Sequence, residues 1–183
     1  MDNITADQSI IISLDVDTFM FDKLQQIVEA GFSLVEINSV DQLFLKNAIT
    51  TFPMLRIGAS NIINTQQLDS CNEAKVHFIT SPGYLPSIVQ TACIYTINYL
   101  PGIATLSEAL QAHEQGCKQV RPFPANLQFC TLLNKYLPDL KLFPAEIEID
   151  EVEHYLSLPS VSAVSILNPE IKQLQTLRSS VFA

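Results

Sequence analysis

The chain has 183 residues, of which 48% are apolar and 16% are charged. This composition excludes a disordered chain and supplies enough hydrophobic side chains for one core, so we expect residues 1–183 to form a single domain. Ten basic and nineteen acidic side chains give a net charge of −9, which would repel a phosphate backbone or an anionic lipid surface, so we expect neither nucleic acid nor a membrane as a partner.

Short apolar runs alternate with helix-length amphipathic segments from one end of the chain to the other. The runs that we predict as strands are, in chain order, Ser9–Asp15, Phe32–Ile37, Pro53–Gly58, Lys75–Thr80, Ile94–Leu100, Cys117–Phe123, Asp139–Phe143 and Val161–Leu167. Helical patterns between them include Phe19–Ala30, Gln42–Ile49, Leu106–Gln115 and Leu127–Leu137. The chain order is therefore that of repeated βα units.

Local signals support these boundaries. Gly31 and Gly116 stand where a left-handed residue ends a helix, and Thr105 with Glu108 forms a capping box at the start of another helix. Most of the strands are apolar almost throughout, as is typical of strands covered on both faces. Eight βα units in 183 residues predict an α/β fold, a single (β/α)8 TIM barrel. An open doubly wound sheet is the alternative, but no predicted strand is followed by GxGxxG.

The sequence carries no signal for export, membrane insertion or metal binding. No apolar run reaches the roughly 18 residues of a transmembrane helix, and Met1–Ser9 has no basic region. We therefore expect a cytoplasmic protein. The four cysteines form no CxxC, which favours free thiols over disulfides or zinc, and the three histidines form no H-x-H or H-E-x-x-H group. We expect no metal and no other cofactor.

Two charged residues interrupt otherwise apolar strands. Glu36 is near the end of one predicted strand, and Arg121 lies within another. A carboxylate inside a barrel costs several kcal/mol unless it is paired or reaches solvent or a ligand. Two interpretations are open: the two residues form an internal ion pair, or Glu36 transfers protons on a bound carbonyl compound.

Five segments at the predicted strand ends belong together. They are Val35–Ile37, Ile57–Asn61, Ile79–Gly83, Leu100–Glu108 and Phe123–Ala125. These segments resemble the KDPG/KHG aldolases, and the most specific of them reads LPGIATLSE. The resemblance runs from about Ser9 to Leu167. It implies a trimeric (β/α)8 lyase that cleaves keto-deoxy-phosphogluconate or hydroxy-oxoglutarate to pyruvate plus an aldehyde.

The resemblance implies roles for individual residues. Glu36 falls on the family's catalytic acid/base, and Pro82 and Phe123 fall on residues that shape the pyruvate pocket. The family's Schiff-base lysine belongs to the pattern L-K-F-F-P-A-E, which reads V-R-P-F-P-A-N here, so that Arg121 occupies the lysine position. A guanidinium stays protonated and cannot act as an amine nucleophile. We therefore expect that Arg121 forms no imine.

Other positions of the family pattern are also missing or replaced in this sequence. No arginine follows Glu36 within Ile37–Asp41, and the family threonine is replaced by Asn61. The family's P-T-G-G-I is one residue shorter here, as Pro144–Ile147, and its G-G-S reads Ser165–Leu167. Glycine loops admit a phosphate closely and offer it backbone N–H groups. Their loss disfavours a phosphorylated substrate, and both termini are also shorter than in the family.

The remaining substrate-binding candidates are Asn61, Pro82, Phe123 and Ala145. Lys141 is an alternative nucleophile, because Leu140–Glu146 reads LKLFPAE and copies the family wording, although on the seventh predicted strand instead of the sixth. It precedes Phe143 by two positions and would lie lower in the barrel than a residue at the mouth. A relocated Schiff-base lysine and an ordinary lysine at the bottom of the barrel are the two interpretations.

Two functional hypotheses follow. The first is a non-catalytic relative in which Arg121 pairs with Glu36, catalytically impaired or repurposed for binding a small 2-keto acid. The alternative is an active lyase that cleaves an unphosphorylated hydroxy-keto acid to pyruvate plus an aldehyde, with Glu36 as acid/base and Arg121 holding a carboxylate. Loss of the nucleophile favours the first. The resemblance implies a homotrimer in either case.

Overall fold

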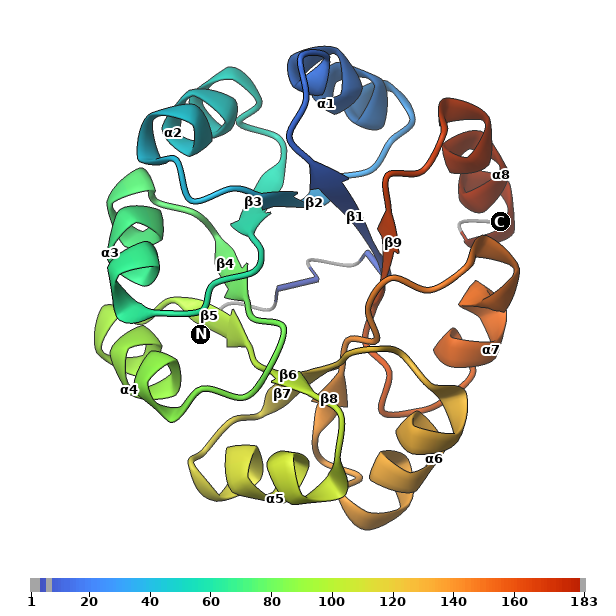
Figure 1. The fold of residues 1–183 in the computed structure, drawn as a ribbon. Helices are drawn as coiled ribbons and strands as arrows, with labels where there is room; N and C mark the ends of the chain where they lie inside the picture. Colours follow the sequence, from blue (N-terminus) through green and yellow to red (C-terminus); the bar gives the residue numbers. More distant parts are fainter. Residues whose placement is uncertain (1–3, 6–7, 182–183) are drawn as a thin grey trace.

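The computed structural model describes residues 4–5 and 8–181 as an α/β fold. Parallel strands form a central ring that the helices surround (Figure 1). The strands of these residues are β1 (Ile10–Asp15), β2 (Leu34–Asn38), β3 (Arg56–Ala59), β4 (Phe78–Thr80), β5 (Asn98–Leu100), β6 (Gly102–Ile103), β7 (Gln119–Pro122), β8 (Lys141–Leu142) and β9 (Val164–Leu167). The helices are α1 (Met20–Glu29), α2 (Gln42–Thr51), α3 (Thr65–Ala74), α4 (Pro86–Tyr95), α5 (Leu106–Glu114), α6 (Leu127–Tyr136), the 3-10 turn η1 (Ile149–Glu151), α7 (Val152–Leu156) and α8 (Ile171–Val181).

Parallel pairing closes the strands into a barrel. Six strands follow the order β5-β4-β3-β2-β1-β9, and three more follow β6-β7-β8. The strand β6 continues β5 after Pro101, and Leu142 of β8 bridges to Val161 ahead of β9. The two sheets therefore meet at both borders, with β5 and β6 together forming one strand of the barrel. The predicted α/β fold with a (β/α)8 barrel is confirmed.

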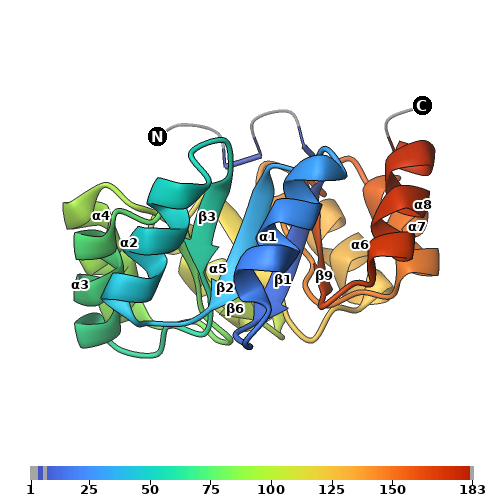
Figure 2. The same cartoon turned by 90° about the horizontal axis from the view of Figure 1, so that it is seen from above.

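Side-chain alternation divides each strand between an outer and an inner core. On β1, Ile10 and Ile12 belong to the apolar layer between strands and helices, whereas Ile11 belongs to a second cluster. Figure 2 shows the helices running alongside the strands around that outer layer. The second cluster lies inside the barrel and consists of Ile4, Ile11, Leu34, Phe78, Leu100, Phe143 and Ala163. Further along the same strands, the inward positions become polar, with Ser13 on β1 and Glu36 on β2.

The predicted strand Ile94–Leu100 is wrong at its beginning. Ile94 lies in the last turn of α4, Thr96 ends that helix with a left-handed φ of 55°, and β5 starts only at Asn98. The apolar run thus spans a helix end and a strand, because Ile94 is an exposed apolar residue on the helix surface. Lys75 similarly ends α3 with a φ of 65°, so the strand predicted from Lys75 begins three residues later, at Phe78.

Other local signals behave as predicted. Gly31 and Gly116 adopt φ values of 83° and 87° just after α1 and α5, and Thr105 and Glu108 form both hydrogen bonds of a capping box. Pro53, by contrast, lies in a turn before β3, so that the predicted strand there is also too long. Among the described residues, no helix combines the length and the hydropathy needed to span a bilayer.

Candidate functional site

A buried ion pair joins two distant strands of the barrel. Glu36 of β2 is 0% exposed and Arg121 of β7 is 5% exposed. The guanidinium is bidentate, since Nη1 donates to Oε2 at 3.0 Å and Nη2 donates to Oε1 at 2.6 Å. Ser13, the register neighbour of Glu36 on β1, also donates its hydroxyl to Oε1. The internal ion pair predicted from the sequence is therefore present.

The burial of these two groups makes their pairing important. Removing a charged group from water costs several kcal/mol unless a partner compensates it, and bidentate guanidinium–carboxylate contacts are among the strongest. A guanidinium carries five N–H groups, of which two donate to Glu36; within residues 4–5 and 8–181 the other three have no hydrogen-bond acceptor. Arg121 therefore keeps donors that an additional acceptor could use.

Three polar side chains form a second cluster where β1, β2 and β9 end. Asn38 donates from Nδ2 to Oδ1 of Asp15 at 3.0 Å, and Asn168 donates to Oδ2 at 2.9 Å. The backbone N–H of Asp15 donates to Oδ1 of Asn168 at 3.0 Å. These side-chain hydrogen bonds, that from Asn38 first, lower the pKa of Asp15. A fixed negative charge consequently lies at the carboxyl ends of these strands.

Glu146 lies in the loop after β8 with a backbone conformation that favours glycine. Its φ is 56°, a region that other residues adopt only with strain. Its N–H donates to Oγ of Ser165 at 3.1 Å. Desolvation raises the pKa of its carboxyl; Arg121 acts in the opposite direction, while Glu36 and Asp15 raise it further. The side chain is therefore within electrostatic range of the ion pair.

Replacing Glu146 with glycine should raise the free energy of unfolding at pH 7 by about 0.5–1 kcal/mol, because glycine adopts this φ without strain. A folded-state pKa raised above the unfolded value means that ionisation disfavours the fold. The gain in stability from Glu146→Gln should therefore be present at pH 7 and disappear below pH 4.5, the ordinary pKa of a glutamate carboxyl. Urea denaturation at pH 7 and in acid measures both variants. A Glu146→Gln effect that is equal in the two conditions would contradict this explanation.

The four predicted substrate-binding residues all follow carboxyl ends of strands. Asn61 comes after β3 with a φ of 61° and is exposed, and Ala145 comes after β8 and is buried. Pro82 is exposed after β4, and Phe123 is half-buried after β7. Parallel strands place these positions at one end of the barrel. The backbone of Pro82 approaches Gly102 so closely that a Cβ at that glycine would lie 2.4 Å from the carbonyl carbon of Pro82.

Lys141 occupies a different level of the barrel. It is the first residue of β8, it is exposed, and its register partner is Gln119. The same register places Phe143, two residues later, beside Arg121. Lys141 therefore lies one inward layer closer to the amino end of the strands than the ion pair. Within the described part of the chain, the cation paired with Glu36 is Arg121.

Sequence reasoning missed Ser13 and the cluster around Asp15. Alternation along β1 would have found Ser13, because Ile11, Ser13 and Asp15 share one face. No comparable sequence pattern indicates Asn168, because its hydrogen-bond partner Asp15 is 153 residues away in the chain. No group of three or more His, Cys, Asp or Glu side chains suited to a metal ion occurs in residues 4–5 and 8–181.

Comparison with known proteins identifies several aldolases as relatives. The family model described as KDPG and KHG aldolase matches residues 6–171. The 2-dehydro-3-deoxy-phosphogluconate aldolase of Pseudomonas aeruginosa is 26% identical over 117 residues, which cover 61% of this chain and 53% of that protein. The KHG/KDPG aldolase of Escherichia coli is 37% identical over 73 residues, which cover 40% of this chain and 34% of that protein. The matched part thus spans about half the length of these relatives or less.

A solved structure shares the fold over nearly the whole chain. It is the KDPG aldolase of Legionella pneumophila with pyruvate captured as a covalent carbinolamine intermediate. The TM-score is 0.84 at 24% sequence identity, and the superposition covers 97% of this chain and 96% of that one. At this identity the likeness establishes the barrel architecture alone.

Proposed function

The chain belongs to the KDPG and KHG aldolase family, and we propose that it is a member without imine chemistry, which binds a small unphosphorylated 2-keto acid non-covalently. The observation that carries this proposal is the bidentate ion pair between Arg121 and Glu36. A guanidinium remains protonated and has no nucleophilic lone pair, so it cannot attack a ketone carbon. The amine that would form a carbinolamine is absent from this position.

The remaining N–H groups of Arg121 supply the binding chemistry. A planar guanidinium suits a carboxylate, which accepts charge-assisted hydrogen bonds in the same plane. One edge of this guanidinium is committed to Glu36, so a 2-keto acid would use the donors that have no partner among the described residues. The covalent capture of pyruvate by the Legionella pneumophila relative supports the ligand class, without implying the same reaction here.

Negative charge at the mouth supports an unphosphorylated ligand. Glu146 lies in the loop where the family pattern has glycines, and Asp15 ends β1 as a carboxylate held by two amides. Two acidic side chains raise the cost of bringing a dianionic phosphate to this end of the barrel. The homotrimer and the cytoplasmic location that the resemblance and the sequence imply are parts of the same proposal.

Borohydride trapping with pyruvate tests the proposal. A lysine amine would attack the ketone to form a carbinolamine, which would lose water to give an imine. Hydride from borohydride would then reduce the imine to a stable secondary amine that mass spectrometry detects. We expect no such adduct on the wild-type chain and reversible pyruvate binding in ligand-observed NMR. An adduct mapped to Lys141, or pyruvate released from hydroxy-oxoglutarate, would overturn the proposal in favour of an active lyase with Glu36 as acid/base.

A further inference from the structure

A cavity lies at the end of the barrel opposite the ion pair, where the strands begin. Its volume is about 380 Å³, and its walls come from α4, the start of β5, the segment after α5, and the starts of β7 and β8. Neither Glu36 nor Arg121 lines it. Small-molecule sites in proteins typically measure about 300–1,000 Å³, so this space could hold a compact organic molecule.

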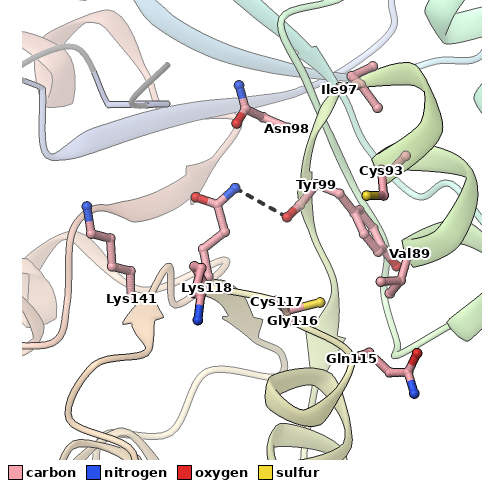
Figure 3. A pocket seen from close by; sticks show the side chains of 12 residues that line it. Val89, Cys93, Ile97, Asn98, Tyr99, Gln115, Gly116, Cys117, Lys118 and Lys141 are labelled. Carbon is pink, nitrogen blue, oxygen red and sulfur yellow. Dashed lines mark hydrogen bonds between the residues drawn. The ribbon is translucent and has the colours of Figure 1, made fainter. Parts of the chain in front are cut away.

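Pro101 explains why the barrel wall is open there. Register between β6 and β7 places Pro101 opposite Val120, and proline has no N–H to donate to the neighbouring strand. The ladder between β5 and β7 is therefore interrupted below this point, and β5 and β6 fall into separate sheets. A side chain bridges the interruption, because Nε2 of Gln119 donates to the carbonyl of Tyr99 at 3.3 Å (Figure 3).

The charge of the cavity is positive although the chain is acidic. Lys118, which directly precedes β7, and Lys141, the first residue of β8, both line it, and its twelve lining residues include no Asp or Glu. The backbone N–H of Lys141 donates to the carbonyl of Lys118 at 3.0 Å, so the two backbones are neighbours, and their side chains extend in different directions (Figure 3). Within the described residues neither lysine has an acidic partner within ion-pair distance. Two uncompensated ammonium groups attract an anion.

Asn98 adds a polar side chain at the start of β5. It is 8% exposed, it opens β5 at the cavity, and its amide makes no hydrogen bond among residues 4–5 and 8–181. Figure 3 shows Asn98 and Lys141 projecting from separate strands that border the cavity. The amide atoms of Asn98 are not sealed from water, because the described side-chain atoms that are both buried and without a partner are Arg56 Nε and Ser160 Oγ. Asn98 is therefore suited to donate to a ligand oxygen.

The opposite wall is apolar. Val89, Ala92 and Ile97 line it together with the ring of Tyr99, whose hydroxyl is already used in a hydrogen bond of 2.9 Å to Oγ of Ser81. Burial raises the pKa of the Cys117 thiol to about 11, as in a poorly hydrated surrounding. A molecule that satisfied both walls would combine an anionic group with an apolar body.

We propose that this cavity is a binding site for a small amphipathic carboxylate, a molecule with one carboxylate group and a short apolar chain. Lys118 and Lys141 neutralise the carboxylate, Asn98 donates to it, and the chain packs against α4 and the Tyr99 ring. The site is separate from the carboxyl end of the barrel and does not depend on the function proposed for Arg121.

Calorimetric titration of the full chain with hexanoate tests the site. We expect saturable binding, at least about tenfold weaker binding of acetate because it lacks the apolar chain, and no competition from pyruvate. The variant Lys118→Gln/Lys141→Gln should weaken hexanoate binding about tenfold, whereas Lys46→Gln/Lys135→Gln removes two exposed charges elsewhere and should leave it unchanged. Absence of saturable binding, equal affinities for acetate and hexanoate, or equal effects of the two double variants would each overturn the proposal.

Cys93 reports on the position of the ligand. It is exposed and lines the cavity from α4, so a bound apolar chain should slow its alkylation by iodoacetamide at least about threefold at saturation. Peptide mass spectrometry measures this rate. An unchanged rate for Cys93 at saturating hexanoate would place the binding elsewhere and overturn the assignment of the site.

Discussion

Replacing Arg121 with methionine should lower the free energy of unfolding by about 3–5 kcal/mol. The substitution keeps an unbranched side chain but leaves Glu36 buried, 0% exposed, and without its guanidinium. Ser13 alone would then donate to the carboxylate. Combining Arg121→Met with Glu36→Met removes both charges, so we expect the double variant to recover most of the lost stability, since buried pairs often exchange for apolar residues at little cost.

A surface ion pair of the same length provides the control. Nζ of Lys23 lies 2.6 Å from Oδ2 of Asp17, and both side chains are more than one third exposed. Lys23→Met should therefore change the unfolding free energy little, because water already compensates exposed charges. Urea denaturation at pH 7 measures all the variants. A small loss for Arg121→Met, or a double variant less stable than either single one, would contradict a pair whose main role is mutual neutralisation.

The ion pair could be predicted from the sequence because both of its residues break the apolar pattern of a strand. Glu36 and Arg121 each interrupt an apolar strand, and a barrel that turns alternate residues inward leaves such charges few alternatives to pairing. Barrel closure followed in the same way from eight βα units. The level of Lys141 in the barrel could also be predicted from the sequence. It precedes Phe143 by two residues, so its side chain is on the same face of the strand and one layer closer to the strand's amino end.

Features that depend on precise register between distant strands could not be predicted. The bonds from Asn38 and Asn168 to Asp15 require three strand ends to stop at matching heights, which no local pattern encodes. Helix ends at Lys75 and Thr96 were missed for a related reason, because non-glycine residues adopt a left-handed φ there. The cavity below Pro101 arises from a missing N–H combined with the packing of α4, and only the proline is visible in the sequence.

Replacing Arg121 with lysine should create an adduct with pyruvate that borohydride traps. The amine would stand in the position that the sequence resemblance assigns to the family's Schiff-base lysine. It would lie next to Glu36, which we expect to move the proton during carbinolamine dehydration. Lysine is also smaller than arginine, so it leaves space beside Glu36. Because it forms no bidentate contact with that carboxylate, its side chain is held less rigidly. The neighbouring candidates Pro82 and Phe123 are unchanged by the substitution.

The expected result is stoichiometric labelling of Arg121→Lys and none of the wild-type chain, read from intact mass and mapped to position 121 by peptide mass spectrometry. Arg121→Met is the matched control, because it removes the guanidinium without supplying an amine. Circular dichroism establishes that each variant is folded before trapping. A folded Arg121→Lys chain that gives no adduct would mean that this end of the barrel does not receive a 2-keto acid, which contradicts the proposed ligand. Labelling at Lys141 in the wild-type chain would instead identify a relocated nucleophile. An amine at the amino end of the strands would then form the imine with pyruvate, a step that our proposal assigns to no residue of this chain.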